Sequence, residues 1–204
     1  ASGATYINYG LEMAKGVLDN RTETTYVKTD GSVADRKTVV IVFTDGVPGR
    51  YTDDRYGFQD NDQEDYNQIS VANKALSIAD EIKGSGTTVY SIGIFSGANP
   101  SANYNFSIST YKAGSRWDSR YVTYYNTATQ AANAFLHFLS SDYTKAVNMT
   151  TPVRTTVVNN GYYLAASNAD DLSEVFKGIA GSITESGTTV KLTADSVMKD
   201  IMAD

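Results

Sequence analysis

Apolar residues recur along this chain in two patterns, which predict alternating helices and strands. Four stretches place apolar residues three and four positions apart, as one-sided helices do: residues 6–18, 67–83, 128–139 and 167–183. Two runs are apolar at nearly every position, which is typical of strands covered on both faces: Val39–Phe43 and Val89–Phe95. A further strand is expected at 162–166, and a short one at 25–28. The chain therefore alternates between the two kinds of element.

The order of these elements predicts the architecture. Strand 39–43, helix 67–83 and strand 89–95 follow one another as a βαβ unit, whose right-handed crossover makes the two strands parallel. Ser167 with Asp170 resembles a capping box and predicts where the last helix begins. We expect an α/β fold with a doubly wound, mostly parallel sheet and helices on both faces.

Other segments lack a clear period and are interpreted as connections or extensions. Residues 19–36 are polar and predict a surface connection, apart from the short strand. Residues 96–127 are rich in Asn, Ser and Tyr and are interpreted as a long insertion with a binding role or a role in pinning loops. We expect one domain over 1–185, and a C-terminal extension or the start of a following module over 186–204, where 188–193 alternates like a strand.

Composition excludes several classes of function. The 204 residues contain 17 Lys and Arg against 23 Asp and Glu, so the chain has no basic field that would attract nucleic acid or an anionic membrane. Cysteine is absent, which excludes thiolate metal sites, thiol catalysis and disulfides. No stretch approaches the roughly 20 apolar residues of a spanning helix. The start at Ala1, without Met or a signal sequence, is expected to be a processed or cropped end.

Two oxygen-bearing residues adjoin predicted elements, and one of them stands at the end of a strand, where open α/β sheets collect ligands. Asp45 directly follows the apolar strand 39–43, and Thr5 directly precedes the first helix. A carboxylate and a hydroxyl are ligands suited to Mg²⁺. Each residue also has a structural interpretation, because Thr is a common helix N-cap and Asp before Gly46 is a common turn residue. His137, the single histidine, lies among apolar residues of a helix and is interpreted as a boundary residue rather than a base.

Several segments, in order, resemble the von Willebrand factor type A (VWA) family. Residues 3–11, Gly-Ala-Thr-Tyr-Ile-Asn-Tyr-Gly-Leu, resemble its segment with the metal-site threonine, and 39–46 resemble the strand ending in its metal-site aspartate. Residues 88–95 resemble its next strand, and 168–183 its last helix. Residues 133–166 resemble VWA domains of surface and pilus-tip proteins of Gram-positive bacteria. The resemblance covers about residues 1–185.

The resemblance implies a function based on a metal bridge. Thr5 and Asp45 would be ligands of a metal-ion-dependent adhesion site, with Mg²⁺ as the expected cation and Ca²⁺ or Mn²⁺ as alternatives. A carboxylate from a protein or surface ligand would complete the coordination. The chain would then be an adhesion module that is extracellular, on the cell surface, in a cell-wall-anchored protein or a pilus. No nucleic acid or membrane partner is implied.

The chain departs from the family in one respect. The family's first strand ends in Asp-x-Ser-x-Ser, which supplies further direct ligands, and no such motif occurs in these 204 residues. We expect that strand to come from a missing N-terminal segment of the same protein or from a second chain. The alternative function is a structural or assembly domain of a bacterial surface fibre with a vestigial metal site.

Enzymatic and calcium-loop interpretations have less support. No G-x-S-x-G nucleophile motif, phosphate-binding loop or dinucleotide fingerprint follows any strand, so no enzyme activity is expected. The loop between Gly46 and Tyr66 is crowded with acidic residues, but 60–65 lacks the glycine that an EF-hand needs at its sixth position. We interpret this loop as a solvated acidic segment.

Overall fold

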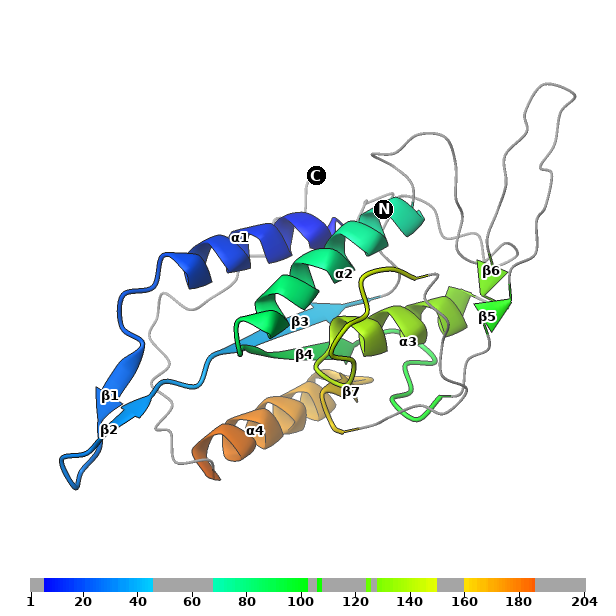
Figure 1. Ribbon diagram of the computed structural model, residues 1–204. Coiled ribbons are helices and arrows are strands. Elements are labelled where there is room, and N and C mark those ends of the chain that lie inside the picture. Colours follow the sequence, from blue (N-terminus) through cyan, green and yellow to red (C-terminus); the bar gives the residue numbers. More distant parts are fainter. Residues whose placement is uncertain are drawn as a thin grey trace, which may run out of the picture.

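The computed structural model describes residues 6–45, 68–102, 106–107, 124–125, 128–149 and 160–185. Within them, a central sheet carries three helices on one face and one on the other (Figure 1). Helices α1 (Ile7–Asp19), α2 (Gln68–Gly84) and α3 (Ala128–Leu139) share the first face, and α4 (Ala169–Glu185) covers the second. The predicted α/β class, with helices on both faces, is confirmed.

The central sheet contains three parallel strands in the order β3-β4-β7. β3 spans Val39–Thr44, β4 spans Thr88–Gly93 and β7 spans Tyr163–Ala165. β4 lies in the middle, with Val39 opposite Thr88 on one side and Ser91 opposite Tyr163 on the other. The predicted parallel pairing of the first two strands is therefore confirmed, and the third predicted strand is one residue shorter at each end.

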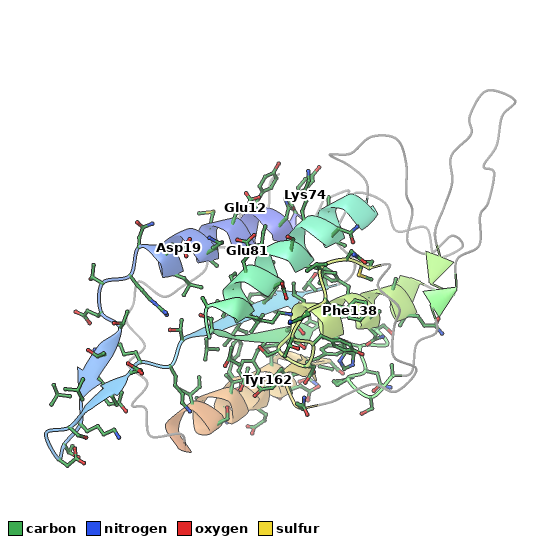
Figure 2. The ribbon with its side chains drawn as sticks, in the orientation of Figure 1. Glu12, Asp19, Lys74, Glu81, Phe138 and Tyr162 are labelled. Atoms are coloured by element: carbon green, nitrogen blue, oxygen red, sulfur yellow. The ribbon has the colours of Figure 1, made fainter. Side chains whose placement is uncertain are left out.

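Side chains of β3 alternate between the two cores, as the two-residue period of a strand requires. Val40 and Val42 belong to the larger core beneath α1, α2 and α3. Val39 and Ile41 pack with the smaller core, where Tyr162 lies between the sheet and α4 (Figure 2). A strand that is apolar on both faces is thus explained by helices on both sides.

The helices bury the apolar stripes that their sequences predict. In the stripe of α3, five apolar residues are buried, namely Ala131, Ala132, Phe135, Phe138 and Leu139. α2 ends at Gly84, and Gly86 follows with a φ of +82° and donates to the carbonyl of Lys83 at 3.0 Å, as helix C-termini commonly do. In α4, Ile179 is buried, whereas Phe176 is 39% exposed.

The start of α4 is capped one residue later than predicted. Asn168 Oδ1 accepts a hydrogen bond from the backbone N–H of Asp171 at 2.9 Å, and Asp171 Oδ2 accepts one from the N–H of Ser167 at 2.9 Å. Asn168 therefore caps the helix instead of Ser167, and Asp171 instead of Asp170 reaches back, to the N–H of Ser167. The sequence pattern signalled a cap correctly, but two adjacent polar pairs could form it.

Two small antiparallel ladders lie outside the central sheet. β1 (Thr25–Val27) pairs with β2 (Val33–Asp35) in a hairpin that projects from the body of the fold (Figure 1), where only the first strand was expected. The turn between them uses Gly31, whose φ is +83°. β5 (Phe106–Ser107) pairs with β6 (Tyr124–Tyr125) inside the predicted insertion. The rest of 103–127, and residues 186–204 with their predicted strand and following module, lie outside the described residues.

Candidate metal site

The carboxyl ends of the three parallel strands meet at one end of the fold, and the amino ends of the four helices point to the same end (Figure 1). Loops that leave parallel strands at this edge form the usual binding crevice of open α/β sheets. Helix amino ends add a partial positive charge there. This edge is therefore where the fold can best hold a ligand.

Asp45 occupies this edge, immediately after the last residue of β3. The preceding residue, Thr44, is buried, and its carbonyl accepts a hydrogen bond from the N–H of Ile94 at 2.9 Å. Asp45 itself is exposed. The sheet thus fixes the backbone up to Asp45 and leaves the carboxylate accessible, as a metal ligand or a turn residue would require.

Thr5 lies outside the described residues, and so does the acidic loop 46–67. The described chain begins at Tyr6, which takes the N-cap position of α1 and makes no capping hydrogen bond with its side chain. The N-cap interpretation of Thr5 therefore falls one residue short of the observed helix start. The amino end of α1 and the carboxyl end of β3 lie at the same end of the fold (Figure 1).

Neighbouring polar side chains at this edge serve the fold. Asn133 on α3 donates to the carbonyl of Gly97 at 3.0 Å and accepts from the N–H of Asn99 at 2.8 Å. Its Oδ1 also accepts from the hydroxyl of Tyr163 at 2.6 Å, and burial raises the pKa of that tyrosine. The network fixes the loop that follows β4 and leaves no polar group of Asn133 for a ligand. Among the described residues, no three His, Cys, Asp or Glu side chains are grouped so that they could hold a metal.

The sequence did not reveal a second polar cluster beneath α3. There, Lys83 donates to the carbonyl of Tyr143, and the fully buried His137 lies 3.5 Å from Asp142 of the same turn. Burial alone would raise the pKa of Asp142, but hydrogen bonds from His137 and from the N–H groups of Asn160, Tyr163 and Tyr162 lower it. The interpretation of His137 as a boundary residue is wrong, because its side chain is 0% exposed.

Lys83 closes the carboxyl end of α3 from the last turn of α2. Its Nζ donates to the carbonyls of Phe138 at 3.0 Å, Ser140 at 3.2 Å and Tyr143 at 2.6 Å. Burial lowers the pKa of Lys83 to about 8. The three acceptors match the three protons of an ammonium group, so this lysine has a structural role and is not available to a ligand.

Comparison with known proteins adds no family to these observations. No protein-family model matches the chain. Neither the curated proteins nor the solved structures contain a match. In the part of the chain that the structure describes, none of the helices is long and apolar enough to cross a membrane.

Proposed function

We propose that this chain is a VWA-type adhesion module that binds a protein or surface ligand through a divalent cation. Thr5 and Asp45 supply the hydroxyl and carboxylate ligands, and the fold is the doubly wound sheet of that family. The observation that carries the proposal is the exposed carboxylate of Asp45 at the carboxyl end of a buried parallel strand. A hard cation such as Mg²⁺ suits this oxygen donor set.

The proposal requires a further strand beside β3. Within the described residues, β3 pairs with β4 on one edge and with no strand on the other edge. Its sequence is apolar on both faces, as in a strand from the middle of a sheet. Phe43 near its carboxyl end is 41% exposed. An unpaired apolar edge readily accepts another strand. We propose that this strand carries the Asp-x-Ser-x-Ser ligands and comes from a preceding segment of the same protein or from a second chain.

The cation has the role of a bridge in this proposal. Few charged protein groups contact it, so it retains the affinity to take a carboxylate from the partner as its last ligand. Such a module works outside the cell, on a surface protein or pilus, and performs no catalysis. Mg²⁺ is the proposed cation, and Ca²⁺ or Mn²⁺ would meet the same oxygen preference.

The test is adhesion of the protein that carries the completing strand to immobilised extracellular-matrix protein, with Mg²⁺ or with EDTA. EDTA and the Asp45→Ala substitution are each expected to abolish retention. Asp35→Ala is the matched control, because Asp35 is another exposed aspartate at the end of a strand, in the projecting hairpin. Retention that resists both EDTA and Asp45→Ala would favour a structural unit of a surface fibre with a vestigial site.

A further inference from the structure

The side chain of Asn8 is buried at the start of α1, and its amide oxygen has no donor among the described residues. Asn8 is the second residue of the helix and is 5% exposed. Its Oδ1 is fully buried and accepts no hydrogen bond. A buried acceptor that has left water without gaining a donor lowers the stability of a fold. Native structures contain few such groups, and contact with a water or an ion is one purpose that explains them.

The other asparagines in the helices on this face of the sheet do have donors. α1, α2 and α3 contain one asparagine each. On α2, Oδ1 of Asn73 accepts a hydrogen bond from the N–H of Met149 at 2.8 Å. On α3, Oδ1 of Asn133 accepts one from the N–H of Asn99 at 2.8 Å. Asn8 is therefore the exception among these three asparagines.

Asn8 lies on the side of α1 that faces α2. Lys15, about two turns further along the same side, has its Nζ 3.7 Å from Oε2 of Glu81 on α2 (Figure 2). The helical neighbours Ile7 and Leu11 belong to the larger core. The Cα–Cβ bonds of a helix tilt toward its amino end, and this end of α1 lies at the carboxyl end of β3 (Figure 1). The amide is therefore directed toward the edge of the sheet where the cation is proposed.

The oxygen of Asn8 can only accept, so its partner must supply a proton or a positive charge. A free water molecule would be poorly held, because buried waters typically make about three hydrogen bonds and the adjacent core residues of α1 are apolar. A water bound to Mg²⁺ is held by the metal, and Mg²⁺ usually keeps several waters instead of a complete set of protein ligands. The metal also lowers the pKa of such a water and so makes it a stronger donor.

We infer that Oδ1 of Asn8 accepts a hydrogen bond from a water molecule on the divalent cation, an inference that rests on the proposed function. Asn8 is then a positioning residue, which orients the water and helps to hold the cation at the edge of the sheet. A neutral amide does this without adding negative charge, so the cation keeps its attraction for the partner's carboxylate. The fold gives up some stability in the cation-free form and recovers it when the cation binds.

Asn8→Leu tests this role, because leucine matches the shape of asparagine without its polar atoms. In EDTA, the urea midpoint of the protein that carries the completing strand is expected to rise, since the substitution removes an unsatisfied buried acceptor. Titration calorimetry is expected to show Mg²⁺ affinity about tenfold weaker, the low end of the effect of outer partners of metal ligands. A lower midpoint in EDTA, down to failure to fold, or an unchanged Mg²⁺ affinity would overturn the inference.

Two further variants separate the possible explanations. Asn73→Leu is the matched control, because it leaves the N–H of Met149 without its acceptor; it is expected to lower the midpoint and to leave Mg²⁺ affinity unchanged. Asp45→Ala is expected to abolish Mg²⁺ binding. If it does so while Asn8→Leu binds Mg²⁺ normally, this inference fails and the proposed function stands. Absence of Mg²⁺ binding in the unsubstituted protein would overturn both. Complete loss of binding in Asn8→Leu would make Asn8 a direct ligand and contradict the contact through water.

Discussion

Replacing Lys83 by methionine should measure how much the buried polar cluster contributes to stability. Methionine keeps most of the side-chain volume but removes three hydrogen bonds, to the carbonyls of Phe138, Ser140 and Tyr143. A hydrogen bond from a charged group contributes about 1.5–3 kcal/mol, and a buried carbonyl that loses its donor costs about 1–3 kcal/mol. The variant also relieves the burial of a charge, which offsets part of this loss.

We therefore expect Lys83→Met to lower the free energy of unfolding by about 2–4 kcal/mol. Urea denaturation followed by circular dichroism at pH 7 provides the measurement, with the midpoint shifting at constant slope. Lys177→Met is the matched control, because Lys177 forms an exposed helix pair with Glu174 at 2.7 Å, and such pairs contribute less than about 1 kcal/mol. Equal effects of the two substitutions would refute the assigned role of Lys83.

Three further predictions concern pH and packing. Burial lowers the pKa of Lys83 to about 8, so above that pH the unfolded chain binds more protons than the folded one. The stability of the unsubstituted protein relative to Lys83→Met should therefore rise between pH 8 and 10. A difference in urea midpoints that falls over this range would contradict the sign. The pKa of Asp142 is lowered in the fold, so the stability that this carboxylate contributes is present above about pH 4 and lost as the pH falls further. The stability difference between the unsubstituted protein and Asp142→Asn should therefore shrink in acid. A difference that stays constant with pH would argue against this role of Asp142. Phe135→Ala removes a side chain that is 0% exposed and should lower the free energy of unfolding by about 3–5 kcal/mol. Phe176→Ala removes a side chain that is 39% exposed and should lower it by less than about 1 kcal/mol. Thermal unfolding that ranks the two variants in the reverse order would show the assignment of the core to be wrong.

Local patterns predicted the scaffold because they arise from local causes. The continuous apolar run of β3 follows from burial of both its faces, and the apolar stripe of α3 follows from burial of one face. Both patterns can be recognised in the sequence alone. The hairpin strand Val33–Asp35 was missed, since its Val-Ala-Asp is poorer in β-branched and aromatic residues than the Thr-Tyr-Val of its partner strand.

Polar residues were predicted less well, because their partners are distant in sequence. Lys83 lies 55–60 residues from the carbonyls that it contacts, and His137 lies 37 residues from Pro100. No periodicity relates such positions, so His137 could be interpreted only from its own apolar neighbours. Asp45 is different, since its place at the end of an apolar strand is itself a local signal and the structure puts it at the carboxyl edge of the sheet. The convergence of Thr5 with Asp45 stays a prediction.

Paramagnetic broadening by Mn²⁺ tests that convergence most directly. In ¹⁵N-labelled protein that carries the completing strand, substoichiometric Mn²⁺ is expected to broaden the amide signals of both Thr5–Ile7 and Thr44–Gly46, since ligands of one cation lie within a few ångströms of it. Thr5→Ala or Asp45→Ala alone should greatly weaken the broadening at both segments, and Asp35→Ala should leave it intact. Broadening near Asp45 with unaffected signals around Thr5, or broadening that survives Asp45→Ala, would contradict the shared metal site.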